Sequence, residues 1–280
     1  MSLNKVIIII GASSGIGAGL ARYISNDAKN QLKKIGLVLV ARRENELNQA
    51  ANNAKNDYCS TLVIPADVTK RENVEKIFQE TKLKFNKISC WVNNVGLGIS
   101  RSVLDLTDDD IDTMIRVNVK TALYGMQIII PYFRQQGYGH LINISSILGR
   151  VPYTTFRSMY SASKATLNSL TTNLRMELQA DPCCEKIHVT TILPGMVATD
   201  FAMNVIGDSV PKSLTDYKIP FIGPFPRTSQ TIDDVCKIIC DVINNEHPPR
   251  EVYTNPEHEP LIKQYFENVG NFELLLKPPS

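Results

Sequence analysis

The sequence predicts an α/β fold, a doubly wound parallel sheet with helices on both of its faces, built as a single domain. Short apolar runs alternate with longer segments of helical periodicity, a pattern typical of a parallel sheet covered on both sides. The first run, Lys5–Ile10 (KVIIII), is rich in β-branched residues, as expected of a strand buried on both faces. The chain has 280 residues, enough to bury the core of one large domain, predicted here as 1–280.

The remaining elements follow in order along the chain. The further predicted strands are Ile35–Ala41, Leu62–Pro65, Ile88–Val92, Leu141–Ser145, Val189–Leu193 and Glu251–Tyr253. The predicted helices are Ala18–Leu32, one that begins near Arg71, Asp108–Gln127 with an acidic first turn that suits the helix dipole, Ser158–Gln179 and Thr231–Asn244.

A glycine-rich loop, GASSGIG, runs from Gly11 to Gly17 between the first strand and the first helix. Glycines there permit a tight turn and let backbone amides approach a phosphate, while the helix N-terminus favours the negative charge. A loop of this kind can also be only a flexible turn. Its place between a strand and a helix indicates a dinucleotide site.

The end of the second strand bears on which dinucleotide is bound. A site selective for NAD places an acid near this point to hold the ribose 2′-hydroxyl, whereas NADP requires a cation for the 2′-phosphate. This chain has Ala41, Arg42 and Arg43, with no acid before Glu44. A guanidinium matches a phosphate in a bidentate way, so Arg42 predicts NADP. Arg43 could equally be a surface residue that follows the strand.

Tyr160 and Lys164 lie one helical turn apart in the predicted helix Ser158–Gln179, and Ser146 follows the apolar run before it. Residues four apart share a helix face. A free tyrosine loses its proton only near pH ~10, and a neighbouring ammonium would lower that pKa, so Tyr160 could act as a general acid or base. The same spacing also occurs on ordinary amphipathic helices, so the assignment depends on the rest of the chain.

Several motifs stand in one order along about the first 200 residues. They are Ile10–Gly17, Asn93–Gly96 (NNVG), Asn118, Ser146, Tyr160 with Lys164, and Pro194–Gly195. In this order the chain resembles the short-chain dehydrogenase/reductase family, in its compact single-domain branch. Ile10 and Val95 stand where the family usually has Thr and Ala. The Ser146-to-Tyr160 spacing is about one residue longer than usual, so Ser145 or the substrate-side loop could be displaced.

The resemblance implies a Rossmann-type fold and a role for each motif residue. Ser146 and Tyr160 would bind the substrate oxygen, and Lys164 would lower the pKa of Tyr160 and bind the nicotinamide ribose. Asn118 would kink its helix and hold a water that relays protons to Lys164. Asp67 would contact the adenine, although it could also cap the helix near Arg71. The implied cofactor contacts are Gly11, Ser13, Ser14, Gly15, Ile16, Gly17, Arg42, Asp67, Val68, Asn94, Tyr160, Lys164, Val197 and Thr199.

The sequence therefore predicts an NADPH-dependent oxidoreductase that reversibly reduces a ketone or aldehyde. Tyr153, Phe156 and the segment 201–226, rich in aromatics and prolines, suggest an apolar substrate that is lipid, steroid-like or aromatic. These residues could as easily be the packing of a lid, predicted at about 200–230 because long loops in compact domains are often lids.

Two other functions share parts of this pattern. A non-catalytic NADP(H) sensor could use the same fold, but the intact Asn118, Ser146, Tyr160 and Lys164 argue against it. A nucleotide-sugar epimerase of the extended branch also carries Y-x-x-x-K. The G-x-x-x-G-x-G spacing and the lack of a long C-terminal domain argue against that function.

The family also implies a homodimer or homotetramer, formed through helices 108–127 and 158–179. Leu167, Leu170 and Leu174 could serve that contact, or could be buried in the core. The segment beyond about residue 255 could pack on a neighbouring subunit.

Composition excludes several other classes. The net charge of +2 gives no reason to expect nucleic acid, and the six cysteines lack C-x-x-C spacing, which indicates reduced thiols and no metal. The adjacent Cys183 and Cys184 could be redox-sensitive or simply exposed. No run approaches the ~18 apolar residues of a membrane span. With no signal peptide recognised at the start, we expect a cytoplasmic protein.

Overall fold

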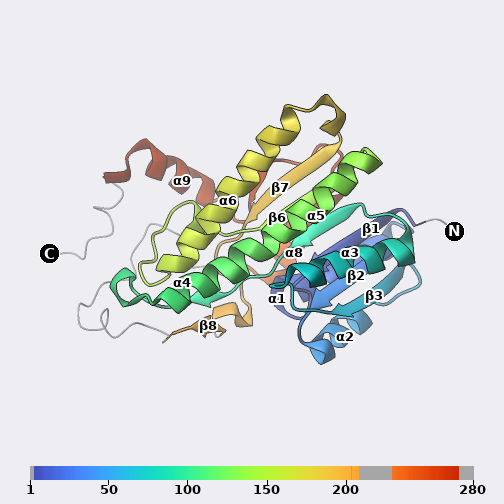
Figure 1. Ribbon diagram of the computed structural model, residues 1–280, viewed down its shortest axis with the longest axis horizontal. Helices are drawn as coiled ribbons and strands as arrows, with labels where there is room; N and C mark the ends of the chain where they lie inside the picture. Colours follow the sequence, from blue (N-terminus) through green and yellow to red (C-terminus); the bar gives the residue numbers. More distant parts are fainter. Residues whose placement is uncertain (1–2, 203, 208–228, 271–280) are drawn as a thin grey trace.

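A seven-stranded parallel sheet forms the centre of the computed structural model, which describes residues 3–202, 204–207 and 229–270 (Figure 1). The strand order is β3-β2-β1-β4-β6-β7-β9. The strands are β1 (Lys5–Ile10), β2 (Ile35–Ala41), β3 (Cys59–Pro65), β4 (Cys90–Asn93), β6 (Gly139–Ile144), β7 (Ile187–Leu193) and β9 (Glu251–Tyr253). The order reverses between β1 and β4, and a crevice for a ligand is expected at the carboxyl ends of the strands beside such a switch.

Helices cover both faces of this sheet, which confirms the predicted doubly wound fold. They are α1 (Gly15–Asn30), α2 (Glu44–Asn53), α3 (Arg71–Phe85), α4 (Asp108–Ile115), α5 (Thr121–Gln136), α6 (Ser158–Gln179), α8 (Ile232–Asn244) and α9 (His258–Glu267). Residues of α1, α2 and α8 share one core with the sheet, and residues of α3, α5 and α6 share the other. In Figure 1, α3, α5 and α6 lie side by side across one face.

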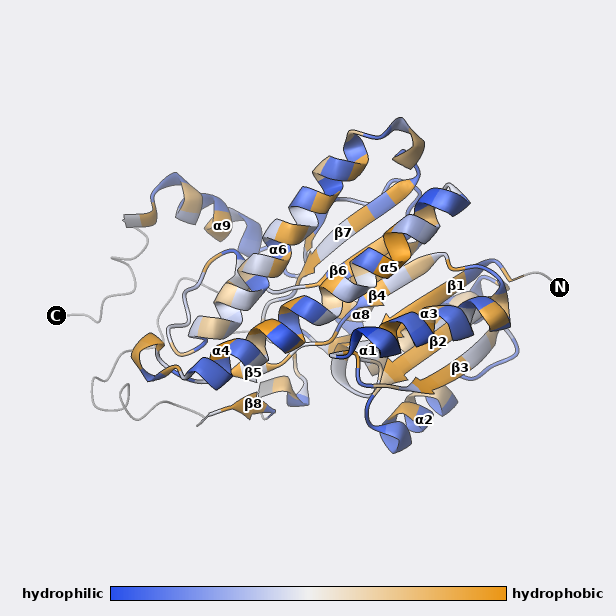
Figure 2. Ribbon diagram, viewed as in Figure 1, coloured by the Kyte–Doolittle hydropathy of each residue, from blue (hydrophilic) through white to orange (hydrophobic). Residues whose placement is uncertain are grey.

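The apolar run KVIIII of β1 belongs to both cores. Ile7 and Ile9 face the core with α1, whereas Ile8 and Ile10 face the core with α3. Successive strand residues point to opposite faces, so a strand between two helical layers must be apolar at every position. Figure 2 shows the resulting continuous apolar colour along β1 and β2, in contrast with the striped helices outside them.

The predicted helix Asp108–Gln127 is interrupted and longer than expected. A π-helical turn, Arg116–Lys120, separates α4 from α5, and α5 ends at Gln136 before Gly137 with a φ of +81°. Thr107 is the N-cap of α4 and forms a capping box with Asp110. Such turns insert one residue into the helical ladder and often mark functional sites. Here the turn contains Asn118, which is buried.

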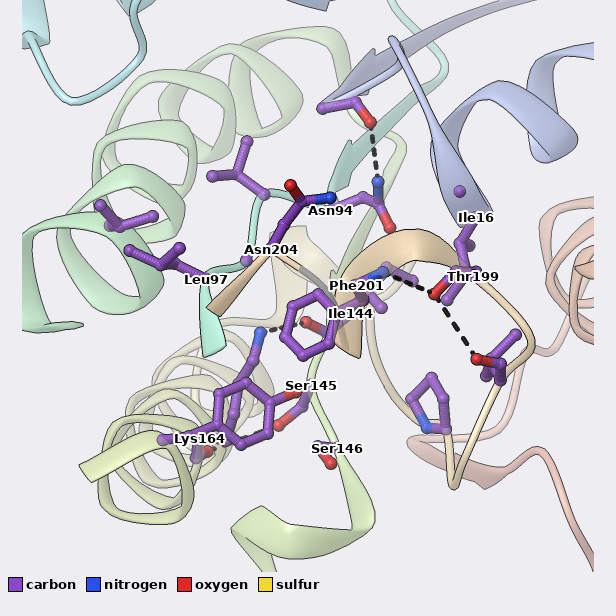
Figure 3. A pocket seen from close by; sticks show the side chains of 18 of the residues that line it. Ile16, Asn94, Leu97, Ile144, Ser145, Ser146, Lys164, Thr199, Phe201 and Asn204 are labelled. Carbon is purple, nitrogen blue, oxygen red and sulfur yellow. Dashed lines mark hydrogen bonds between the residues drawn. The ribbon is translucent and has the colours of Figure 1, made fainter. Parts of the chain in front are cut away.

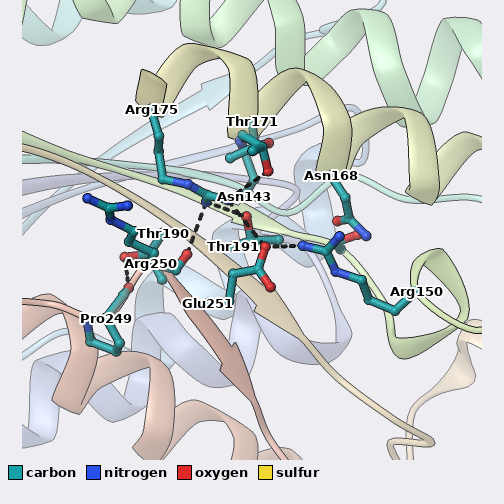
Figure 4. Close-up of polar contacts among 12 residues, drawn as sticks. Asn143, Arg150, Asn168, Thr171, Arg175, Thr190, Thr191, Pro249, Arg250 and Glu251 are labelled. Atoms are coloured by element: carbon teal, nitrogen blue, oxygen red, sulfur yellow. Dashed lines mark hydrogen bonds and ion pairs between the residues drawn. The ribbon is translucent and has the colours of Figure 1, made fainter. Parts of the chain in front are cut away.

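An ionic cluster fastens the edge strand β9 to the rest of the fold (Figure 4). The carboxylate of Glu251 accepts hydrogen bonds from Arg150 and, at 3.2 Å, from Arg175 of α6. Arg175 also donates to the hydroxyl of Thr191 in β7 at 3.0 Å. Because Arg150 follows Ser146 closely in the chain, this cluster connects β9 to α6 and to the segment beside the predicted catalytic serine.

The sequence did not predict α2, α9 or several short elements. These are a two-stranded sheet of β5 (Gly98–Ile99) and β8 (Val205–Ile206), the 3₁₀ turns Val103–Asp105, Ile147–Gly149, Pro182–Cys184 and Asp200–Ala202, and the π turn already described. Most of the predicted lid at about 200–230 lies outside the described residues. Among the helices described, none combines the length and apolarity needed to cross a bilayer.

Candidate active site

A cavity of about 1100 Å³ opens at the carboxyl ends of the central strands. The glycine-rich loop lines one part of it, and Ser146, Tyr160 and Lys164 line another. Figure 3 shows that residues from distant parts of the chain, among them Ile16, Asn94, Lys164 and Thr199, surround the same space. The crevice expected from the strand order is therefore present, and it contains most of the residues predicted from the motifs.

The glycine-rich loop has the conformation that its sequence predicts. Gly11 and Gly15 have φ values of +88° and +53°, in the left-handed region that favours glycine. A Cβ at Gly17 would lie 2.1 Å from the carbonyl oxygen of Gly11, so no larger residue fits there. The side chain of Asn94 donates a 3.0 Å hydrogen bond to the same Gly11 oxygen (Figure 3). The loop is thus held at the start of the 16-residue helix α1, where helix amides favour phosphate.

Two arginines follow β2 at the far end of the cavity, and both line it. Arg43 donates hydrogen bonds to the hydroxyls of Ser14 at 2.8 Å and Ser13 at 3.2 Å. Its Nη1 also lies 3.5 Å from the carboxylate of Glu46. From the sequence, Arg43 could equally be a surface residue; in the structure its side chain is half exposed and donates to the serines of the glycine-rich loop.

Asp67 and Val68 follow β3 and line the same end of the cavity. Burial alone would raise the pKa of the Asp67 carboxyl, but hydrogen bonds from Thr69 and the charge of Arg42 lower the pKa on balance. The carboxylate accepts from the Thr69 amide at 3.1 Å and the Thr69 hydroxyl at 2.8 Å. It thus shapes the turn that leads into α3, without capping the helix itself, since Lys70 is at the cap position.

Tyr160 is buried at the start of α6, and its phenol differs electrostatically from what the sequence predicted. Burial raises the pKa of Tyr160 to about 12, while a hydrogen bond with Ser146 and the charge of Arg157 act in the opposite direction. Lys164 is not among the groups that lower it. The raised pKa runs opposite to the expectation that Lys164 makes this phenol acidic, because desolvation outweighs the neighbouring charges.

The ammonium of Lys164 is directed elsewhere. It donates a 3.0 Å hydrogen bond to the carbonyl oxygen of Ile144 at the end of β6, and it lies 5.9 Å from the centre of the Tyr160 ring (Figure 3). Burial lowers the pKa of Lys164 to about 8. Within the described residues Lys164 forms no ion pair with a carboxylate, and burying such a cation is costly, as is typical of functional positions.

Asn118 lies just behind the cavity wall, in the π-helical turn. Its Oδ1 accepts from the Leu97 amide at 2.8 Å, and its Nδ2 donates to the Leu97 carbonyl at 2.9 Å and to Ser163 at 3.0 Å. A Cβ at Gly96 would lie 3.6 Å from the Lys164 ammonium and 3.9 Å from Asn118 Oδ1. Asn118 thus fixes the backbone that passes in front of Lys164.

The structure distinguishes the two candidate serines. Ser146 shares a hydrogen bond with Tyr160, and its hydroxyl also accepts from the Leu148 amide at 3.2 Å. Ser145 instead directs its hydroxyl to the Lys164 carbonyl at 3.4 Å. Ser146, and not Ser145, is therefore the serine whose hydroxyl acts on the Tyr160 phenol.

The turn that follows β7 closes the cavity. Val197 and Thr199 line it, and the methyl carbon of Thr199 would lie 3.5 Å from a Cβ at Gly15. Phe201, two residues further on, places its ring 5.6 Å from the ring of Tyr160, measured between centres. The described part of the predicted lid thus reaches Tyr160.

The predicted site residues are brought together almost completely. All of them line the cavity except Gly17 and Asn118, which support its wall. Sequence reasoning missed Arg157, which also lines the cavity, and gave Phe201 no individual role. The spacing of Arg157, one helical turn before Tyr160, was a signal that could have found it.

None of the cysteines is among the described residues that line the cavity. All six cysteines are free thiols, and only Cys183 is exposed. Within the described ranges, His, Cys, Asp and Glu side chains form no group of three or more that could hold a metal ion.

Comparison with known proteins identifies the family that this fold and site define. A family model described as short chain dehydrogenase matches residues 5–209. The chain therefore belongs to the short-chain dehydrogenase family of oxidoreductases. It is 35% identical over 196 residues to an uncharacterized oxidoreductase of Staphylococcus epidermidis, covering 70% of this chain and 79% of that protein. It is 36% identical over 197 residues to an uncharacterized oxidoreductase of Staphylococcus saprophyticus, covering 70% and 80%.

Solved structures share the fold at low sequence identity. A short-chain dehydrogenase/reductase from Burkholderia phymatum in complex with NAD has a TM-score of 0.79 and 20% identity, covering 99% of this chain and 97% of that chain. An alcohol dehydrogenase from Thermococcus sibiricus complexed with 5-hydroxy-NADP has a TM-score of 0.72 and 21% identity, covering 89% and 95%. At these identities the likeness establishes the fold alone.

Proposed function

We propose that this protein is an NADPH-dependent reductase that reversibly converts a ketone or aldehyde into an alcohol. The observation that carries the proposal is the meeting of Ser146, Tyr160 and Lys164 in one cavity with a phosphate-binding loop. The hydroxyl and the phenol are hydrogen-bond donors for a reacting oxygen, as carbonyl reduction requires, and the ammonium adds a positive charge in the same cavity.

The residues present fit a dinucleotide with a 2′-phosphate. Gly11, Gly15 and Gly17 leave room for a pyrophosphate at the start of α1. Arg42 and Arg43 line the end of the cavity where the second strand stops, and no acid stands between them and that strand. Two related solved structures were obtained with NAD and with a modified NADP, so the fold itself accepts either cofactor. The arginines are the reason to propose NADPH for this chain.

Bound NADPH would supply the hydride to the carbonyl carbon. The raised pKa of Tyr160 keeps its phenol protonated at neutral pH, so Tyr160 begins the reaction with a proton to donate to the carbonyl oxygen. Ser146 donates a second hydrogen bond to that oxygen as negative charge develops on it. The buried Lys164 holds a positive charge nearby and would bind the ribose hydroxyls of the cofactor, and Asn118 keeps the adjoining backbone in place.

Walls of low polarity support an apolar substrate. Leu97, Leu148, Phe156 and Phe201 line the cavity, and burial raises the pKa of Tyr153 to about 12, so that ring is neutral as well. We propose that these residues receive the carbon skeleton next to the reacting carbonyl.

The test is oxidation of NADPH by a panel of ketones and aldehydes, followed by the loss of the absorbance of reduced nicotinamide. Turnover that disappears in Tyr160→Phe supports the proposal. A protein that binds NADPH tightly but reduces nothing in a panel of aromatic, aliphatic and steroid-like carbonyls is a sensor on this fold, and one that acts on a nucleotide sugar without net loss of NADPH is an epimerase.

We also propose a cytoplasmic homodimer or homotetramer, with α4, α5 and α6 at the main contact. Of the three leucines expected at this contact, Leu167 is buried in the core of the protomer and Leu174 is partly buried against it, whereas Leu170 is partly exposed and is not among the residues of either core. Met176, further along α6, is 63% exposed and is a further candidate. Light scattering at micromolar concentration tests the assembly, and a monomer there refutes it.

A further inference from the structure

Arg157 is a charged residue in the substrate part of the cavity that the catalytic scheme does not use. It stands at the N-cap of α6, one helical turn before Tyr160. Its Nη1 donates a 3.1 Å hydrogen bond to the carbonyl oxygen of Ile99 in β5, and a Cβ at Gly98 would lie 3.1 Å from the same nitrogen. The guanidinium therefore rests on the backbone of β5, in a defined position beside the catalytic tyrosine.

The charge of Arg157 is not neutralised by any carboxylate that the structure describes. Its neighbour Arg101 forms a 2.9 Å ion pair with Asp110, and Arg150 pairs with Glu251. No such pair within 4.0 Å is found for Arg157 in the described segments 3–202, 204–207 and 229–270. An arginine stays protonated in proteins, so a positive charge faces the cavity.

The residues around the Arg157 guanidinium remove part of its solvent, which costs free energy unless an anion binds it. The guanidinium carbon lies 5.5 Å from the centre of the Phe156 ring. Phe201 is a second aromatic neighbour, since a Cβ built on Gly98 would lie 3.1 Å from Nη1 of Arg157 and 3.3 Å from the Phe201 ring. Partial burial lowers the pKa of Arg157, which reflects the loss of solvent around the cation. A guanidinium in an apolar setting gains most from a planar anion that it can bind through two parallel hydrogen bonds.

We propose that the substrate is an oxo acid, an apolar carbonyl compound that carries a carboxylate, and that Arg157 binds this carboxylate. This inference rests on the proposed reductase function and narrows its substrate class. Arg157 and Tyr160 line the same cavity and their charged forms act on each other electrostatically, so one small molecule could present an anion to Arg157 and a carbonyl to Tyr160. The apolar walls receive the remainder of the skeleton, and Arg157 selects the acid over neutral ketones.

The same charge also acts on the Tyr160 phenol, so the experiment has to separate the two roles. The probes are 2-oxo-4-phenylbutanoate and 4-oxo-4-phenylbutanoate, each compared with its primary amide, in the presence of saturating NADPH. The amide keeps the shape and the reacting carbonyl but lacks the negative charge. The measured quantity is the ratio of kcat/KM for the acid to that for its amide, in the wild type, Arg157→Gln and Arg157→Lys.

We expect the wild type to prefer at least one of the acids by roughly 10- to 100-fold, as for loss of a hydrogen bond to a charged group. Arg157→Gln should lose that preference while it still reduces the amide, and Arg157→Lys should keep part of it. Arg134→Gln removes an equal charge from a half-exposed position of α5 that does not line the cavity, and it should leave the ratio unchanged.

Equal losses for acid and amide in Arg157→Gln would show that the arginine acts only on Tyr160 or on folding, and would overturn the proposal. A wild type that reduces the amides as well as the acids would also overturn it while leaving the reductase function intact. If no carbonyl compound is reduced, the proposed function fails. Calorimetric binding of the two acids to the NADP⁺ complex then still decides the role of Arg157: binding lost in Arg157→Gln supports it, and absent or unaltered binding refutes it.

Discussion

Replacing Lys164 with Met should make the cofactor-free protein respond differently to pH. Met has a similar length and no charge, so Lys164→Met removes a buried cation while it largely preserves packing. Burial lowers the pKa of Lys164 from 10.5 to about 8, whereas the unfolded chain restores the ordinary value. Between these two values the unfolded state binds more protons than the folded state, so the stability of the wild type rises with pH.

The size of the effect follows from the two pKa values. One pKa unit corresponds to ~1.4 kcal/mol, so below about pH 8 the charged Lys164 costs about 3 kcal/mol of folding free energy. From pH ~7 to pH ~9.5 this cost falls by about 2 kcal/mol. The pKa of Tyr160 is raised from 10.0 to about 12. Titration of that phenol therefore lowers stability only between these two pH values, above the range used here.

The assay is urea unfolding of wild type and variant at several pH values, with the difference in free energy of unfolding plotted against pH. All other groups titrate in both proteins, so the difference isolates Lys164. Between pH ~7 and pH ~9.5 the free energy of unfolding of the wild type should rise by about 2 kcal/mol relative to that of Lys164→Met. Lys237→Met removes an exposed lysine of α8 and should give a flat difference. A flat difference for Lys164→Met as well would refute the argument that burial strains this lysine.

Three further outcomes are expected. Tyr160→Phe should abolish turnover but leave NADPH binding, measured by fluorescence titration, close to wild type, and substantial remaining activity would place the proton donor elsewhere. Arg42→Asp combined with Arg43→Ser should turn a preference for NADPH in kcat/KM into one for NADH, and an equal or better wild-type value with NADH would contradict the assignment. Glu251→Ala should cost about 1 to 3 kcal/mol in urea unfolding because it leaves two partly buried arginines without their carboxylate. Asp241→Ala, which breaks an exposed pair on α8, should cost below about 0.5 kcal/mol, and equal losses in the two variants would show that the Glu251 cluster adds no stability.

Local patterns in the chain were sufficient for the fold and for most of the site. The run of Lys5–Ile10 predicts a doubly covered strand because burial on two faces leaves no place for a polar residue. Gly11, Gly15 and Gly17 predict the phosphate loop because its backbone angles and close contacts exclude other residues. Such signals are readable in sequence because the physical constraint acts on neighbouring residues.

Short and polar elements could not be predicted from the sequence in the same way. Helix α2 (Glu44–Asn53) has few apolar residues, and β5 and β8 contain two residues each, so periodicity gives little warning of them. The π turn around Asn118 depends on a side chain that bonds to Leu97 and Ser163, both distant in sequence. These features exist because of partners that only the folded chain supplies.

The sequence by itself determined the doubly wound sheet and the glycine-rich loop, since each rests on spacing within one strand, loop or helix, and the order of the motifs, through the family resemblance, predicted which residues line the cavity. Only the tertiary structure decided the charges in that cavity. It showed that burial raises the pKa of Tyr160 and lowers that of Lys164, that Lys164 is directed to Ile144, and that Arg157 faces the cavity. Desolvation depends on every atom packed around a group, and those atoms come from β4, β6, α6 and the turn after β7, so no local pattern contains that information.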